Sequence, residues 1–155
     1  MTEKRSGKLP AYILDAAGLF RISLLDSKIM FTTNEALNEV EDENERLIVG
    51  TYLKSSRLKA IEPGEDMKKL AFKIAESNPN LTDADISIIA LALMLREKYD
   101  ITIVTDDYEL QNILALNKIK FKGIKTAGIK RVIKWAYRCT GCGRQFEKPI
   151  KTCPY

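Results

Sequence analysis

The sequence predicts an α/β fold, a parallel sheet covered by helices on both faces in an α/β/α sandwich. Two observations predict it. Short apolar runs alternate along the chain with longer segments of helical periodicity. These runs are almost continuously apolar, which is typical of strands buried on both faces. With 155 residues, 45% apolar and 30% charged, the chain suffices for one such domain and a small appendage.

Five apolar runs are expected to form the strands, and the segments between them to form helices. The runs are residues 11–15, 28–33, 57–64, 101–105 and 118–124. The helical segments are residues 16–25, 34–40, 43–56, 67–74, 82–98 and 107–117. Pro63-Gly64 stops the third strand, and Thr82 caps the long apolar helix that follows. Residues 129–139 alternate between apolar and basic side chains, which indicates a half-exposed strand.

The charges are divided unevenly along the chain. From Lys118 onward there are eleven Lys and Arg against one acid, a net charge of +10. Residues 1–117 hold fourteen bases and twenty acids, a net charge of −6. An acidic body with a basic tail points to a polyanionic partner, of which nucleic acid is the natural one.

Several acids fall where strands end or where the following helices begin. They are Asp15, Glu39, Asp83, Asp85, Asp106 and Asp107. If the sheet is parallel, the strand ends share one edge, where function collects in such folds. Crowded carboxylates repel one another unless a proton or a cation neutralises them, and oxygen ligands favour Mg²⁺ or Mn²⁺. Such a site is suited to metal-assisted hydrolysis of a phosphodiester.

Each acid also has a structural interpretation. Asp83 alone is explained by its place in the first turn of a helix. Glu39 stands in an acidic run that reaches Glu45, for which a solvated face is the default. Asp15 is different, because an acid directly after an apolar strand has less structural reason to be there. The functional interpretation therefore depends on the combination of acids.

Taken together, four segments resemble in order the acidic motifs of the PIN-domain ribonucleases. They are YILDAAG at 12–18, TTNEALNEV at 32–40, LTDADISIIALA at 81–92 and IVTDDYELQN at 103–112. The resemblance implies catalytic, metal-binding roles for Asp15, Glu39, Asp85 and Asp107, with Asp83 and Asp106 as additional partners of Mg²⁺ or Mn²⁺. Thr105 would hydrogen-bond a carboxylate and fix its orientation.

Two further features look like the NOB (NIN-one-binding) endonucleases of ribosome assembly, of the archaeal type. They are Gln111 to Leu114 and a cysteine motif directly behind the nuclease domain. The resemblance implies cleavage of precursor small-subunit rRNA at its mature 3′ end. The implied partners are the pre-ribosomal small subunit and other assembly factors. The PIN-like domain would cover residues 11–125, a basic linker or strand 126–138, and a zinc ribbon 139–155.

The cysteines predict the zinc ribbon only in part. Cys139 and Cys142 form a C-x-x-C motif, Cys153 begins a Cys-Pro, and the chain has no histidine. An odd number of clustered cysteines favours Zn²⁺ over disulfides. Ribbons of this kind usually present C-P-x-C, so we expect a fourth ligand directly after Tyr155, and hence an incomplete ribbon in this sequence. Three reduced cysteines in a loose tail are the alternative.

The basic segment is expected to bind RNA through its phosphates. The residues are Lys118, Lys120, Lys122, Lys125, Lys130, Arg131, Lys134 and Arg138. The first three are expected to alternate along one strand face. Tyr137, Trp135 or Phe146 would stack on unpaired bases. Alternatively, Trp135 and Tyr137 form a small core between ribbon and body, which is the interpretation that we favour for Trp135.

The sequence also bears on where the protein acts and on which other functions are open to it. The polar start of the chain, a flexible tail at 1–10, lacks the apolar stretch of an export signal. The longest apolar run, residues 86–95, is too short for a bilayer, so we expect a cytoplasmic protein with no membrane partner. A toxin-type PIN ribonuclease is one alternative, which the ribbon disfavours. A catalytically weak RNA-binding assembly factor is another, which the complete set of four acids disfavours.

Overall fold

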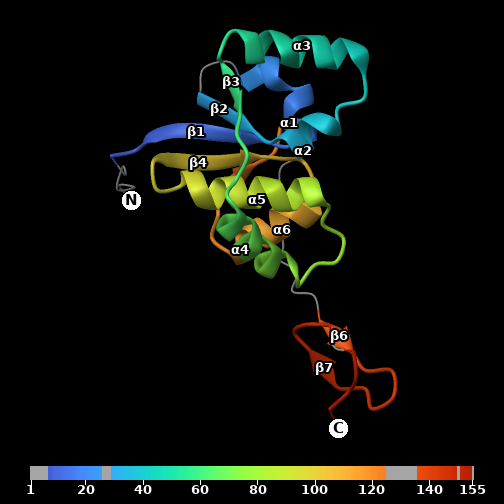
Figure 1. The fold of residues 1–155 in the computed structure, drawn as a ribbon. Coiled ribbons are helices and arrows are strands. Elements are labelled where there is room, and N and C mark those ends of the chain that lie inside the picture. The colour runs from blue at the N-terminus through green and yellow to red at the C-terminus, as the bar shows by residue number, and fades with distance from the viewer. Residues whose placement is uncertain (1–6, 26–28, 125–135, 150, 155) are drawn as a thin grey trace.

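The computed structural model describes residues 7–25, 29–124, 136–149 and 151–154. Its main body is a five-stranded parallel sheet flanked by helices (Figure 1). The strands are β1 (Leu9–Leu14), β2 (Ile29–Thr32), β3 (Leu58–Ala60), β4 (Tyr99–Val104) and β5 (Phe121–Lys122). They lie in the order β3-β2-β1-β4-β5, so the first strand of the chain is central. The predicted α/β class is confirmed.

The register of the sheet brings together residues from distant parts of the chain. β4 pairs with β1 along its whole length, and the pairing ends with Leu14 opposite Val104. The next residues, Asp15 and Thr105, therefore leave the sheet at adjacent positions. β2 pairs with the other edge of β1, so the segment after β2 leaves from the same carboxyl edge.

Helices connect the strands and flank the sheet. They are α1 (Ala16–Phe20), the short 3₁₀ helix η1 (Ile22–Leu25), α2 (Asn34–Asn38), α3 (Glu43–Lys54), α4 (Glu65–Ala75), α5 (Asp83–Leu95) and α6 (Tyr108–Leu116). The apolar α5 packs against β1 and β4 and also against α2 and α4. Ile13, Ile89 and Ile103 are fully buried between these elements.

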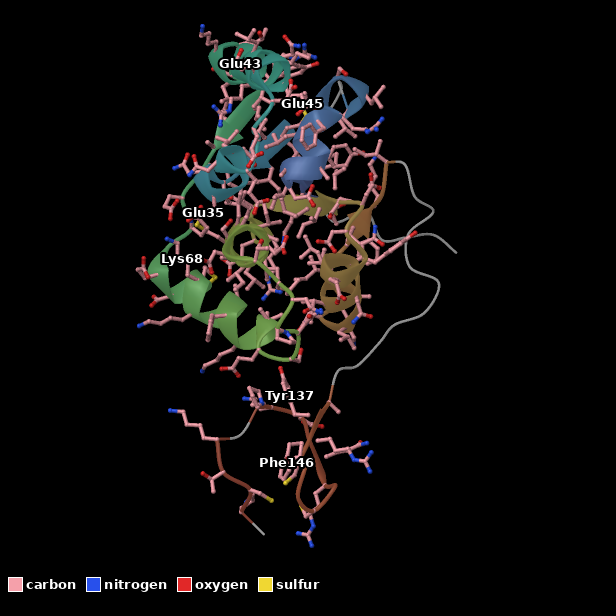
Figure 2. All side chains as sticks on the ribbon, turned by 90° about the vertical axis from the view of Figure 1, so that its right-hand side faces the viewer. Glu35, Glu43, Glu45, Lys68, Tyr137 and Phe146 are labelled. Carbon is pink, nitrogen blue, oxygen red and sulfur yellow. The ribbon has the colours of Figure 1, made fainter. Side chains whose placement is uncertain are left out.

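The described part of the C-terminal segment forms a small antiparallel hairpin of β6 (Tyr137–Arg138) and β7 (Gln145–Phe146). It contacts the main body at the end of α4 (Figures 1 and 2). The Tyr137 hydroxyl donates a hydrogen bond to the Glu76 carbonyl at 3.1 Å. The Lys148 ammonium lies 3.5 Å from the Glu76 carboxylate. Glu76 is therefore a docking point for the hairpin.

Several predicted elements differ from the structure, among them the strand predicted over 57–64, which is regular only at β3. The strand predicted over 118–124 is regular only at β5, because Lys118 has a φ of 56° in the turn that ends α6. The long apolar helix ends at Leu95, earlier than predicted, since the chain turns there to enter β4. β4 itself begins at Tyr99, which pairs with Leu9. Of the strand predicted at 129–139, residues 129–135 lie outside the described part of the chain.

None of the helices in the described ranges is both long enough and apolar enough to span a membrane.

Candidate active site

A pocket of about 270 Å³ lies at the carboxyl edge of the sheet and is lined by four carboxylates. Asp15 is the N-cap of α1, and Glu39 is the C-cap of α2. Asp85 is the third residue of α5, and Asp107 is the N-cap of α6. Four different helix ends thus bring together the four acids that the motifs single out. Phe20 lines the same pocket.

Asp15 is the most buried of the four, with 6% of its surface exposed. Its Oδ1 accepts a 2.7 Å hydrogen bond from the Gly18 amide, and the Thr105 hydroxyl also bonds to the carboxylate. Burial nevertheless raises the pKa of Asp15 from 3.8 to about 6, and the charges of Asp85 and Asp107 add to this effect. The carboxyl group is thus held in place but is costly to ionise.

Thr105 links two of the acids. Its buried hydroxyl bonds to Asp15 and accepts the backbone N–H of Asp107 at 3.1 Å. The fully buried Gln111 donates its amide to the Thr105 carbonyl at 2.8 Å and so fixes the turn between β4 and α6. The expectation that Thr105 fixes a carboxylate is confirmed for Asp15.

Thr82 plays a similar part for the other two acids. It forms a capping box with Asp85, whose Oδ2 accepts the Thr82 amide at 2.9 Å. The Thr82 side chain also bonds to Glu39. Burial raises the pKa of Asp85, and the charge of Asp107 raises it further. Burial and then the charge of Asp85 raise the pKa of Glu39. Mutual repulsion of carboxylates therefore extends across the pocket.

The two additional acids do not line the pocket. Asp83 is exposed in the first turn of α5. Asp106 Oδ1 accepts the Ile124 amide at 2.8 Å, so this carboxylate holds the segment after β5. The resemblance to the PIN motifs assigned Asp107 to the site and left the role of Asp106 open, since Thr105-Asp106-Asp107 offers two neighbouring acids. In the structure Asp107 lines the pocket.

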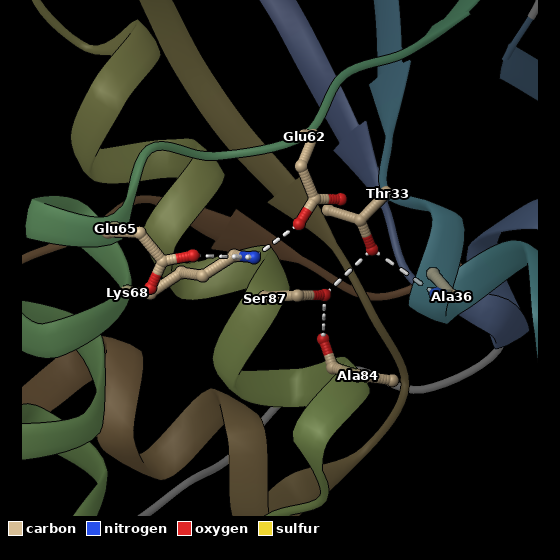
Figure 3. A network of polar contacts seen from close by, with 7 residues as sticks. All are labelled: Thr33, Ala36, Glu62, Glu65, Lys68, Ala84 and Ser87. Atoms are coloured by element: carbon tan, nitrogen blue, oxygen red, sulfur yellow. Dashed lines mark hydrogen bonds and ion pairs between the residues drawn. The ribbon is translucent and has the colours of Figure 1, made fainter.

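Two buried hydroxyls join the helices that carry Glu39 and Asp85 (Figure 3). Thr33 Oγ1 accepts the Ala36 amide at 3.2 Å and lies 2.7 Å from Ser87 Oγ. Ser87 in turn donates to the Ala84 carbonyl at 2.6 Å. Beside this link, Lys68 pairs with Glu62 and lies 3.6 Å from Glu65.

Ser87 is not among the predicted site residues. A lone serine in the apolar run of residues 86–95 was the available signal, because a buried hydroxyl requires a partner.

The donor set suits a hard divalent cation. Four oxygen ligands, with no sulfur or nitrogen among them, fit Mg²⁺ or Mn²⁺. Within the described residues, no three acids bring carboxylate oxygens within 4.8 Å of one another. The acids therefore surround an open volume. Burial, and to a smaller extent the charges of neighbouring carboxylates, raises the pKa of three of them, and a cation in the pocket would favour their ionised forms.

Comparison with known proteins decides the family. No protein-family model matches the sequence. The endoribonuclease Nob1 of Pyrococcus abyssi is 35% identical over 130 residues, which are 80% of this chain and 77% of that protein. The endoribonuclease Nob1 of Methanothermobacter thermautotrophicus is 34% identical over 137 residues, 86% of this chain and 80% of that protein. The chain belongs to the Nob1 endoribonuclease family. The ribonuclease VapC1 of Thermoplasma acidophilum is 31% identical over 147 residues, 92% of this chain and 72% of that protein.

This Nob1-family chain is thus an endoribonuclease with a PIN-like fold. The resemblance that rested on the motif order and the cysteines is confirmed.

In this member of the Nob1 family the three cysteines come together in the C-terminal segment, Cys139 and Cys142 in the loop of the hairpin and Cys153 after it. Their sulfurs all lie within 4.8 Å of one another, and those of Cys142 and Cys153 are 3.5 Å apart. Thiolates bound to one zinc at about 2.3 Å would lie about 3.8 Å apart, so the cluster fits the ion. Hydrogen bonds from the amides of Cys142 and Gly141 lower the pKa of Cys139 to about 7. The thiolate form, which binds metal, is thereby favoured.

The basic residues predicted to bind RNA are only partly described. Lys118 is exposed, and Lys120 lies 2.9 Å from Asp100. Lys122 lies 4.5 Å from the centre of the Tyr12 ring and donates to its hydroxyl. The Arg138 guanidinium bonds to the Gly143 carbonyl at 3.2 Å. Because Lys118 lies in a turn, the first three lysines do not share one strand face as predicted. Lys125, Lys130, Arg131, Lys134 and Trp135 lie outside the described residues.

Proposed function

We propose that this endoribonuclease cleaves precursor small-subunit rRNA in the cytoplasm to generate its mature 3′ end. The observation that carries the proposal is the convergence of Asp15, Glu39, Asp85 and Asp107 on one pocket in a chain of the Nob1 family. The substrate follows from the resemblance to the ribosome-assembly endonucleases. The pre-ribosomal small subunit and other assembly factors are the proposed partners.

The four carboxylates are the proposed ligands of Mg²⁺ or Mn²⁺. When bound, such an ion supplies an activated water and stabilises the charge of the leaving oxygen. The residues of the chain prepare the site in three ways. Thr105 and the Gly18 amide orient Asp15. Thr82 orients Asp85 and Glu39. The buried surroundings of Asp15 raise its pKa to about 6, so a bound cation would further favour its ionised form.

The basic residues and the cysteine hairpin are the proposed means of holding the RNA. Lys118, Lys122 and Arg138 offer charged groups for phosphates, which give affinity without sequence choice. The proposal extends to the basic residues outside the described ranges. Cys139, Cys142 and Cys153 are the proposed ligands of Zn²⁺, which would order the hairpin.

Cleavage of a small-subunit rRNA 3′ precursor, mapped to the nucleotide, tests the proposed function. Wild-type protein is expected to cut at the mature 3′ end with Mn²⁺ and not with a chelator. Asp15→Asn and Asp107→Asn are expected to remove at least about 99% of the rate, as loss of a metal-binding group does at such sites. Asp42→Asn, at the exposed N-cap of α3, is the matched control. Undiminished cleavage by both site variants would refute the site, and cleavage elsewhere would refute the substrate.

A further inference from the structure

Phe20 is the aromatic side chain among the residues that line the pocket, where four carboxylates stand beside four alanines and Ile88. It lines the pocket together with the four carboxylates, and 45% of its surface is exposed. A single exposed apolar residue is normal on a protein surface and needs no explanation by itself. Here the position is informative, because the exposed ring borders the carboxylates of an endoribonuclease. Phe72 and Tyr108, which are exposed by 59% and 55%, do not line this pocket.

The backbone fixes where Phe20 lies relative to the acids. Phe20 is the last residue of α1, the helix that Asp15 caps. Five residues of helix correspond to about 7.5 Å along the axis. The neighbours of Phe20 are anchored, since Leu19 and Ile22 are each 1% exposed and the Arg21 amide bonds to the Gly18 carbonyl at 3.1 Å. The ring is thus presented from a fixed support at a short distance from Asp15.

An RNA substrate supplies a group that suits this ring. A phosphodiester at the carboxylates brings its own bases within a few ångströms. A base in a duplex has both faces stacked, whereas an unpaired base has a flat apolar face free. Aromatic side chains bind such faces with little regard to sequence. The phenyl ring has no polar group that could bind a phosphate or ribose hydroxyl.

We propose that Phe20 stacks on an unpaired nucleobase beside the scissile phosphate and thereby directs cleavage to single-stranded RNA. This inference rests on the proposed RNA cleavage at the acidic pocket. Phe20 would contact the substrate without taking part in the chemistry. It would set the affinity for the nucleotides that flank the cut.

Binding measurements on the full chain test the stacking. The probe is a short fluorescent single-stranded RNA that contains the cleavage site, and Asp107→Asn is present in every protein to prevent turnover. Phe20→Ala is expected to weaken binding about 5- to 150-fold, the range found for loss of one base–aromatic stack. Phe20→Tyr keeps the ring and is expected to bind like the parent. Phe20→Leu keeps an apolar side chain without a flat ring and is expected to resemble Phe20→Ala.

Two controls separate stacking from general effects. Phe72→Ala removes an even more exposed ring, on α4, and the affinity of this variant is expected to be unchanged. A second set of RNAs, each with one abasic nucleotide on one side or the other of the cut, removes the base and leaves the ring unchanged. At the stacked position, the abasic change is expected to weaken RNA binding by the protein that has Phe20. It is expected to have little further effect on RNA binding by Phe20→Ala. In the active enzyme, Phe20→Ala is expected to raise KM more than it lowers kcat.

The outcomes distinguish this inference from the proposed function. Equal affinity of Phe20→Ala and Phe72→Ala would overturn the stacking, as would full additivity of the Phe20→Ala and abasic losses. Wild-type cleavage with Mn²⁺ would leave the proposed function intact in either case. Loss of cleavage in Asp15→Asn together with unchanged binding in Phe20→Ala would refute the stacking alone. If Phe20→Leu bound RNA as tightly as the protein that has Phe20, a simple apolar contact would explain the binding. That result would also overturn the stacking.

Discussion

The hydroxyl oxygens of Thr33 and Ser87 lie 2.7 Å apart in the interior and join α2 to α5 (Figure 3). Since Ser87 donates its proton to the Ala84 carbonyl, Thr33 must donate to Ser87. α2 ends at Glu39, and α5 carries Asp85 in its first turn. The separation of these two carboxylates therefore depends on a hydrogen bond that neither of them makes.

Ser87→Ala removes the acceptor of that bond and leaves the buried Thr33 hydroxyl without it. We expect a loss of about 1–2 kcal/mol in the free energy of unfolding. We also expect Mn²⁺ to bind several-fold more weakly in calorimetric titration of the RNA-free protein, because the two helix ends are no longer tied.

Two control variants accompany Ser87→Ala. Ser55→Ala removes the same kind of bond, from a serine hydroxyl to the carbonyl three residues before, at an exposed site. It is expected to change neither quantity. Val49→Ala removes buried volume from α3 and is expected to cost about 2 kcal/mol without changing Mn²⁺ affinity. If Val49→Ala weakened Mn²⁺ binding as much as Ser87→Ala, the positioning role would be wrong.

Gly18 allows α1 to approach the sheet closely. A Cβ atom at this position would lie 2.9 Å from the Val104 carbonyl oxygen, which is backbone, and 3.4 Å from Asp15 Oδ1. Gly18→Ala is therefore expected to destabilise the protein by about 1–3 kcal/mol and to lower cleavage by displacing Asp15. Gly50→Ala is the matched control, because a Cβ atom there meets nothing within 4 Å in the middle of α3. It is expected to stabilise the protein by about 0.5–1 kcal/mol. Thermal unfolding of both variants measures the contrast, and a stable, fully active Gly18→Ala would contradict it.

The ionised carboxylate of Asp15 costs stability. Because burial raises its pKa to about 6, the folded protein keeps a proton that the unfolded chain releases near pH 4. Stability from this group is complete below about pH 4 and is lost as the pH rises to about 6. The difference corresponds to about 3 kcal/mol as an upper limit. Asp15→Asn is thus expected to be more stable than wild type by about 1–3 kcal/mol at pH 7.5 in the absence of metal.

Urea unfolding with a chelator measures this difference. At about pH 3 the two proteins are expected to have similar stability, because the wild-type carboxyl group is then largely protonated in both states. Asp42→Asn, an exposed N-cap, is the control and is expected to have the same small effect at both pH values. A wild-type protein more stable than Asp15→Asn at pH 7.5 would show that the charge is not costly.

Lys118 offers the simplest test of phosphate contacts beside the nuclease domain. Lys118→Ala is expected to weaken RNA binding uniformly across sequences and to reduce the slope of log affinity against log salt by about 1. Lys54→Ala, at the exposed end of α3, is the control with the same change of charge. Fluorescence anisotropy at several salt concentrations measures both, and identical slopes would exclude a phosphate contact at Lys118.

The cysteine hairpin is expected to bind zinc without supporting the main body. Protein prepared with zinc and reductant is expected to carry one ion per chain, and Cys142→Ser to carry much less. The thermal unfolding temperature of the main body is expected to change little. The contacts described between the hairpin and the main body, those of Tyr137 and Lys148, both meet one residue, Glu76. Native mass spectrometry gives the stoichiometry. An equal zinc content in Cys142→Ser would remove this cysteine from the site.

Local patterns predicted most of the framework. The alternation of apolar runs with helical segments predicted a parallel sheet, since both patterns are read within a few residues of sequence. The cap at Thr82 was predicted from the side-chain chemistry of helix starts, and it is confirmed. Six candidate acids were found because they stand near strand ends and helix starts, and the resemblance to the PIN motifs singled out the four that line the pocket. The strand at 118–124 was overpredicted, because alternation alone does not show where the turn after α6 ends.

By itself the sequence determined the order of the elements, the identity of the acids and the grouping of the cysteines. The tertiary structure decided which acids share the pocket: Asp107 lines it, whereas its neighbour Asp106 turns to the Ile124 amide. It also decided that Ser87 meets Thr33 across 54 positions of sequence and that Phe20 borders the carboxylates. The physical reason is that these contacts depend on strand register and helix packing, which are set by the whole core and by no local pattern.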